Sequence, residues 1–127
     1  MGQRGDLTGR RCEDMAVGYL KENGYKILEK NYRSPFGEID AIAKDGDCLV
    51  FVEVKSRTCD LFGPPYLRLT RHKKDNIIKS ALSYLKKHRL FDSDCRIDVV
   101  SISLDKEAGR IELIRDAFGD DRSAYAR

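Results

Sequence analysis

Apolar residues recur along the chain with two periods, one typical of helices and one typical of strands. In residues 8–23 they fall at the three- and four-residue spacing of an amphipathic helix, at Cys12, Met15, Ala16, Tyr19 and Leu20. Gly24 follows and is expected to end this helix. The same spacing, at Ile77, Ile78, Ala81, Leu82 and Leu85, predicts a second helix over residues 70–89.

The remaining segments predict five strands, at residues 25–32, 37–44, 47–57, 96–104 and 110–114. In the second strand, Ile39, Ala41 and Ala43 alternate with Glu38, Asp40 and Ile42, which gives the strand two unlike faces. The third strand contains an unbroken apolar run from Cys48 to Val52. Such a run is typical of a strand that is covered on both faces at the centre of a sheet.

The order of these elements predicts the fold. Asp45-Gly46 predicts a tight hairpin between the second and third strands. A whole helix separates the third and fourth strands, so we expect them to be parallel and joined by a right-handed crossover. The prediction is a single α/β domain over residues 1–127, an α-β-β-β-α-β core with a mixed central sheet flanked by helices. The tail from about residue 120 is expected to be disordered.

Composition limits the class of protein. The 127 residues are 41% hydrophobic, which is enough to bury a core. The longest apolar run has five residues against the roughly 20 that span a bilayer, and the N-terminal segment is polar. We therefore expect a cytoplasmic protein with no membrane segment. The cysteines lack the spacing of a zinc or redox site and are expected to be reduced thiols; they are Cys12, Cys48, Cys59 and Cys95.

The net charge of +3 is unevenly distributed. Residues 68–89 contain eight lysines and arginines and one acid, Asp75. A basic surface of this kind can bind a polyanion, but a solvated helix face explains a charge run equally well. Lys73 and Lys74 lie one turn before the apolar stripe of the second helix, so they should overhang the edge of the sheet.

Charged residues interrupt the buried face of the third strand. Strand alternation places Glu53, Lys55 and Arg57 on the same face as Leu49 and Phe51. Burying a charge is costly unless it is paired, and apolar residues could replace a purely structural ion pair at little loss of stability. The charged positions therefore indicate a functional site, with a structural ion-pair network, in which Lys55 neutralises Glu53, as the alternative.

The predicted hairpin brings further carboxylates to Glu53. With Asp45-Gly46 as its loop, Glu38 faces Glu53, and Asp40 is a diagonal neighbour on the same face with backbones roughly 7–8 Å apart. Carboxylates this close repel one another unless a cation lies between them, and Lys55 supplies only one positive charge. Oxygen ligands alone favour Mg²⁺ or Mn²⁺ over zinc. A metal site of this kind beside a basic helix suggests a phosphodiester substrate.

Four motifs resemble a known family. They are Gly9 with Glu13, Gly37-Glu38-Ile39-Asp40, the run from Phe51 to Arg57, and Arg96-Ile97-Asp98-Val99-Val100. Together they are similar to the YraN family of small bacterial proteins over almost the entire chain. The spacing from Asp40 to Glu53-Val54-Lys55 resembles the D…E-x-K signature of the restriction-endonuclease-like nuclease superfamily, whose core has the element order predicted above.

The resemblance implies a metal-dependent endonuclease that hydrolyses DNA and is related to Holliday-junction resolvases. It implies that Asp40 and Glu53 hold Mg²⁺ or Mn²⁺ with the main-chain carbonyl of Val54, and that Glu13 reaches the same metal from the first helix. Lys55 would orient the attacking water or balance charge on the phosphate. Because resolvases act on two strands, a homodimer is a further expectation.

Other residues have supporting roles in this hypothesis. Lys73 or Lys74 would match a basic residue found on the helix after the signature, and the motif does not decide between them. We expect these two lysines, with Arg57 and Arg71, to contact the nucleic acid. We expect Glu38 to contact the metal ligands without binding the metal itself. Two alternatives stay open: a non-catalytic nucleic-acid-binding module with the same fold, and a scaffold that engages another protein.

Overall fold

The computed structural model describes residues 2–57, 69–104 and 109–119, with side chains in the first range from residue 10 to residue 56. The expected disordered tail and Cys59 lie outside these ranges. Two helices and five strands follow in the order α1 (Gly2–Glu22), β1 (Lys26–Ser34), β2 (Gly37–Asp45), β3 (Cys48–Arg57), α2 (Arg71–His88), β4 (Cys95–Ser103) and β5 (Arg110–Phe118). In the described part of the chain, neither helix is long and apolar enough to cross a bilayer.

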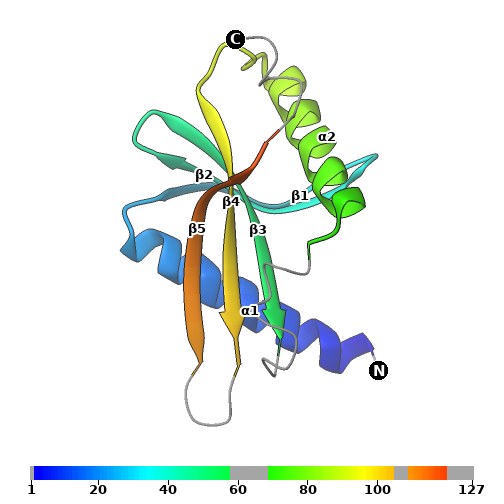
Figure 1. Cartoon of the computed structure of the whole chain (residues 1–127), viewed down its shortest axis with the longest axis vertical. Coiled ribbons are helices and arrows are strands. Elements are labelled where there is room, and N and C mark those ends of the chain that lie inside the picture. The colour runs from blue at the N-terminus through cyan, green and yellow to red at the C-terminus, as the bar shows by residue number, and fades with distance from the viewer. Residues whose placement is uncertain (1, 58–68, 105–108, 120–127) are drawn as a thin grey trace.

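All five strands form one sheet in the order β1-β2-β3-β4-β5. The β3–β4 pair is parallel and the other neighbours are antiparallel, which confirms the predicted mixed sheet and the crossover through α2. Figure 1 shows the two helices packed at the sheet and the long strands β3, β4 and β5 side by side. The single α/β domain and its α-β-β-β-α-β core are confirmed, with α1 starting earlier and β5 ending later than predicted.

The core has two layers, one on each face of the sheet. The layer under α2 includes Ile39, Ile42, Leu49, Phe51, Ile77, Leu85, Ile97 and Val99. The layer under α1 includes Cys12, Ala16, Leu20, Ala41, Ala43, Val50, Val52 and Val100. Strand β3 contributes to both layers, so it is buried on both faces, as its unbroken apolar run predicts.

The ends and the buried face of α2 follow from local chemistry. The Thr70 hydroxyl accepts the Lys73 N–H at 3.1 Å, and Arg89 ends the helix in the left-handed region with φ of 55°. The buried face differs from the predicted stripe because Ser80 and Tyr84 are buried, whereas Ile78 and Leu82 are not fully buried. Leu82 is 36% exposed, whereas Tyr84 is buried against the Tyr32 and Phe51 rings. Aromatic neighbours on β1 and β3, which helical spacing cannot reveal, select Tyr84 for the core.

The β2–β3 hairpin corrects the predicted register by two residues. Its loop is Gly46-Asp47, and Asp45 pairs with Cys48. Positive φ occurs at Gly46 (61°) and not at Asp47. A type II′ turn requires positive φ only at the first loop residue, which favours this loop over a type I′ turn at Asp45-Gly46.

A shift of two residues keeps every side chain on its face but changes which residues are opposite each other. On the observed register, the position opposite Asp40 is Glu53 rather than Phe51, and Glu38 does not face Glu53. The predicted diagonal relationship between Asp40 and Glu53 is therefore wrong.

The alternation predicted for β2 also fails at Asp40. Ile39 belongs to the α2 layer and Ala41 to the α1 layer, although the two residues are two positions apart. On the neighbouring strand, Asn31 lies between the pairs Lys30↔Ala41 and Tyr32↔Ile39 and has φ of 54°. A left-handed residue changes the direction of a strand, so the end of the β1–β2 hairpin turns relative to the rest of the sheet.

Candidate metal centre and nucleic-acid interface

Asp40 lies where β2 separates from β3. The pairs between β2 and β3 run from Asp45↔Cys48 to Ala41↔Val52, and beyond Ala41 the strands diverge (Figure 1). At this point the Asp40 carboxylate accepts the Val54 N–H through Oδ2 at 2.7 Å. The side chain thus satisfies a backbone donor that the departing strand has left without its ladder partner.

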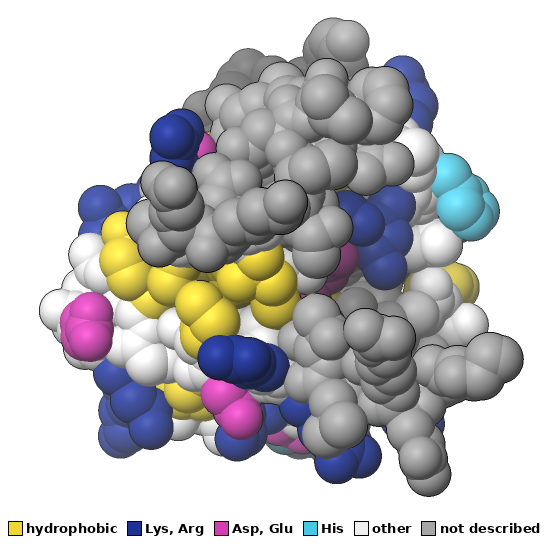
Figure 2. Space-filling model, turned by 90° about the horizontal axis from the view of Figure 1, so that it is seen from below, with side chains coloured by type: hydrophobic (Ala, Val, Ile, Leu, Met, Phe, Trp, Pro, Cys, Tyr) yellow, Lys and Arg dark blue, Asp and Glu magenta, His cyan; other side chains and the backbone are white. Residues whose placement is uncertain are grey.

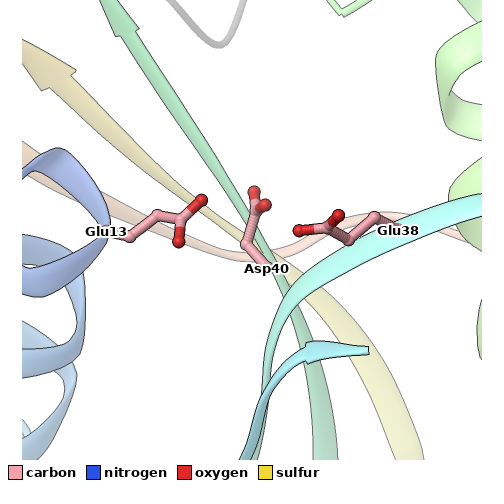
Figure 3. Close-up of side chains that lie close together, drawn as sticks. All are labelled: Glu13, Glu38 and Asp40. Carbon is pink, nitrogen blue, oxygen red and sulfur yellow. The ribbon is translucent and has the colours of Figure 1, made fainter. Parts of the chain in front are cut away.

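Three carboxylates converge beside this separation. One ligand oxygen each from Glu13, Glu38 and Asp40 lies within 4.8 Å of the others. Figure 3 shows Glu13 approaching from α1 and Glu38 from β2, with Asp40 between them. The structure therefore brings together Glu13 and Asp40, as the resemblance implies. It also places a Glu38 oxygen in the same group, whereas Glu38 was expected only to contact the metal ligands.

Asn31 connects two of these carboxylates. Its Nδ2 donates to Glu13 Oε1 at 3.0 Å and to Glu38 Oε1 at 2.9 Å. The left-handed backbone of β1 at this residue aims the side chain at both acids. Asn31 is not among the site residues predicted from the sequence. An asparagine inside a strand-like run could have indicated a left-handed residue at this position, because asparagine tolerates the left-handed region better than most residues.

Glu53, on β3, lies next to Asp40 but outside this group of three oxygens. It is 5% exposed. Burial, followed by the charge of Asp40, raises the pKa of Glu53 to about 8, although Lys73 and Lys55 oppose this shift. Burial also raises the pKa of Asp40, and the nearby charges of Glu13 and Glu38 add to that effect, while the Val54 N–H lowers it.

Cations lie beside these acids: Lys73 Nζ is 3.8 Å from Glu53, Arg33 Nε is 3.6 Å from Glu38, and Lys55 lowers the pKa of Glu53. Glu13, Glu38 and Asp40 still bring three carboxylates together. Their donor set is entirely oxygen, which is the set that Mg²⁺ and Mn²⁺ prefer. A divalent cation would offset both the burial of Asp40 and Glu53 and the smaller charge repulsion that raise their pKa values. The residues present thus fit a metal of this kind.

The structure distinguishes the two lysines that the sequence leaves equivalent. Lys73 Nζ lies 3.8 Å from Glu53 Oε2, with its side chain 46% exposed. Lys74 instead lies over the Phe118 ring at 5.7 Å. Lys73 is therefore the helix lysine at the acidic cluster, and Lys74 points toward β5.

The other predicted basic residues lie near the same end of the sheet or outside what is described. Arg71 is the first residue of α2 and is exposed. Lys55 is half-buried, and its charge lowers the pKa of Glu53. The Arg57 side chain lies outside the described side chains. Lysine and arginine side chains occur at several separate places on the face that Figure 2 shows. Positive charge is therefore not confined to α2.

A cavity of about 210 Å³ opens beside the carboxylates. Glu13, Asp40 and Val54 form part of its wall, and Arg10 and Lys30 contribute positive charge. Glu13 and Asp40 are therefore accessible to a ligand in this cavity. A structural network that served only to hold the sheet end together would not require such an opening.

A second buried polar group is structural. Asp98 is fully buried, and it accepts the Tyr25 hydroxyl at 2.7 Å and Arg96 Nε at 3.0 Å. Arg96 also donates to Asp45 at 2.7 Å. These polar groups have partners within the protein, so Asp98 and Arg96 form a structural pair.

Comparison with known proteins identifies relatives along most of the chain. Residues 12–102 match the family described as "Uncharacterised protein family UPF0102". A UPF0102 protein of Syntrophus aciditrophicus is 55% identical over 120 residues, covering 94% of this chain and 92% of that protein. A UPF0102 protein of Geobacter metallireducens is 47% identical over 110 residues, covering 87% and 90%. A third relative, from Dehalococcoides mccartyi, is 44% identical over 114 residues, covering 90% and 94%.

Proposed function

This chain belongs to the UPF0102 family, also called the YraN family, as its motifs predict, and we propose that it is a divalent-metal-dependent endonuclease. Its substrate would be the phosphodiester backbone of DNA, including branched DNA such as a four-way junction. The convergence of carboxylates from α1 and β2 beside a cavity, with the buried Glu53 of β3 next to Asp40, carries this proposal.

The proposal gives each acidic residue a role. Asp40, Glu53, Glu13 and the Val54 carbonyl would hold Mg²⁺ or Mn²⁺. The bound ion would polarise the phosphate and make water a stronger nucleophile. Glu38 faces the same point, and it would add negative charge that tightens cation binding. Asn31 would keep Glu13 and Glu38 oriented, because it donates to both.

Two lysines would act on the phosphate. Lys55 and Lys73 carry the positive charges next to Glu53, at the margin of the cluster. A phosphate that enters between them gains stabilisation of the charge that develops on its oxygens. Lys55 would also orient the attacking water. Arg71 and Arg57 would contact the flanking backbone, and Lys74 would contribute only general attraction to DNA.

Cleavage assays with matched variants test the proposal. The purified chain is incubated with duplex, single-stranded and four-way-junction DNA in Mg²⁺ or Mn²⁺, alongside Asp40→Asn, Lys55→Ala and the remote exposed control Asp92→Asn. We expect cleavage of at least one substrate by the wild type and the control, and none by the other two variants. Absence of cleavage with every substrate, or equal cleavage by Asp40→Asn, contradicts the proposal.

The basic charge of α2 favours a second candidate, a non-catalytic nucleic-acid-binding module. The helix ends with Lys86, Lys87 and His88 in its last turn and has no acid in its first turn. Binding of this type needs no metal and weakens by orders of magnitude between low and physiological salt. Metal-independent, salt-sensitive binding without cleavage would select this candidate. Failure to bind nucleic acid at all would select a protein-binding scaffold instead.

A further inference from the structure

Phe36 exposes an aromatic ring at the β1–β2 turn, close to the acidic cluster. Its side chain is 47% exposed. It lies four positions before Asp40 in the sequence, so the two Cα atoms are no more than about 14 Å apart. Phe36 therefore lies within reach of a strand whose phosphate occupies the proposed metal centre.

The turn that carries Phe36 is held in one conformation. The Ser34 hydroxyl accepts the Phe36 N–H at 3.0 Å and hydrogen-bonds the Ser80 hydroxyl of α2 at 2.8 Å. Gly37 follows with φ of 145°, and a Cβ there would lie 3.9 Å from Asn76 and Ser80. The turn is thus fastened to α2, while the ring that it presents stays in solvent. A ligand would lose little conformational entropy by ordering it.

One cation lies at the ring. Lys79 Nζ is 5.8 Å from the ring centroid. Arg33, whose side chain is 85% exposed, lies on the same hairpin and approaches Glu38 at 3.6 Å. An exposed aromatic ring next to a cation can stack on a nucleobase while the cation attracts the backbone.

We propose that Phe36 is a stacking platform for an unpaired base of DNA next to the metal centre. Bases inside a duplex are stacked on their neighbours, so the ring selects single-stranded or branched DNA over continuous duplex. This inference rests on the proposed function, because it names the form of DNA that the same site takes.

Binding measurements without metal separate this inference from catalysis. The full chain is titrated into a labelled single strand and into the duplex of the same sequence, in EDTA, and fluorescence anisotropy gives the two Kd values. We expect Phe36→Ala to weaken single-strand binding at least about five-fold, the lower end of the loss for removing one stacked base. Duplex binding should change less than two-fold.

Three further variants make the test specific. Phe36→Trp should restore single-strand affinity, and Phe36→Leu, which is apolar but not aromatic, should not. Phe91→Ala is the matched control, because Phe91 is 60% exposed beyond the C-terminal end of α2. The inference is overturned if Phe36→Ala weakens single-strand and duplex binding equally, or if Phe36→Leu restores single-strand affinity. It is also overturned if Phe91→Ala weakens single-strand binding as much as Phe36→Ala does, or if the wild type does not bind the single strand. Stacking without cleavage in any metal would overturn only the proposed nuclease activity.

Discussion

The Asp40 carboxylate accepts the backbone N–H of Val54 at 2.7 Å at the position where β2 and β3 separate. One side chain therefore ends the ladder between two strands and also belongs to the acidic cluster. The structural half of this role needs only an oxygen acceptor. The proposed metal-binding half needs a negative charge, so the two halves can be separated by substitution.

Asp40→Asn should abolish metal binding without destabilising the fold. The amide oxygen can still accept from Val54, whereas removal of the charge relieves repulsion from Glu13 and Glu38. We expect the free energy of unfolding to stay equal or rise by on the order of 1 kcal/mol. Urea denaturation and a calorimetric Mn²⁺ titration measure the two effects, and a destabilised Asp40→Asn protein would contradict the assignment of the repulsion.

Asn31→Gly should weaken metal binding by about ten-fold or more, because Glu13 and Glu38 lose the amide that orients both. Glycine accepts the left-handed backbone at this position, so the variant keeps the bend in β1. Asn31→Ala loses the amide and also strains the backbone, and it should be the less stable of the two. Unchanged Mn²⁺ affinity in Asn31→Gly would exclude a role for the bridge.

Lys73 and Lys74 should differ in function although they are neighbours in sequence. Lys73→Ala removes the cation at Glu53, and we expect at least about a ten-fold loss of cleavage rate at saturating DNA. Lys74→Ala leaves the cluster intact and should only weaken DNA binding, with a salt dependence reduced by about one counterion. Cleavage rates and salt titrations of both variants check this difference, and equal rates would contradict it.

Tyr25→Phe should destabilise the protein by about 1–3 kcal/mol at neutral pH, because buried Asp98 loses a hydrogen-bond donor. Burial, together with the hydrogen bond to Asp98, raises the pKa of Tyr25 above its usual value of 10. As pH rises, the Tyr25 hydroxyl therefore ionises in the unfolded chain before it ionises in the folded protein. Its contribution to the free energy of unfolding is full below pH about 10 and is lost as pH rises through the pKa of the folded protein.

The alkaline loss of stability should therefore be smaller in Tyr25→Phe than in the wild type. Urea unfolding at pH 8 and above pH 10 gives the comparison. Tyr19→Phe on α1 is the control, since Tyr19 is half-buried and lies on the same face as the predicted stripe. The same pH dependence in wild type and Tyr25→Phe would exclude Tyr25 as its source.

Hydrophobic periodicity predicts the fold because it reflects burial directly. The apolar run of β3 is buried on both faces, and the helix between β3 and β4 makes that pair parallel, as predicted. Periodicity does not distinguish between turns that differ in one φ angle, and so the hairpin register is two residues from its prediction. It also fails at Leu82 and Tyr84, where the shape of the opposing layer decides burial.

The sequence by itself determined the element order, the family, and the residue types of the candidate site: Asp40, Glu53, Lys55 and the more distant Glu13. Only the tertiary structure decided that Glu38 joins the acids directly, that Asn31 bridges Glu38 and Glu13, and that Lys73 rather than Lys74 approaches Glu53. The physical reason is that β2 bends away from β3 at Asp40. Strand and helix periods hold along regular elements, whereas this cluster forms where the regular pairing ends.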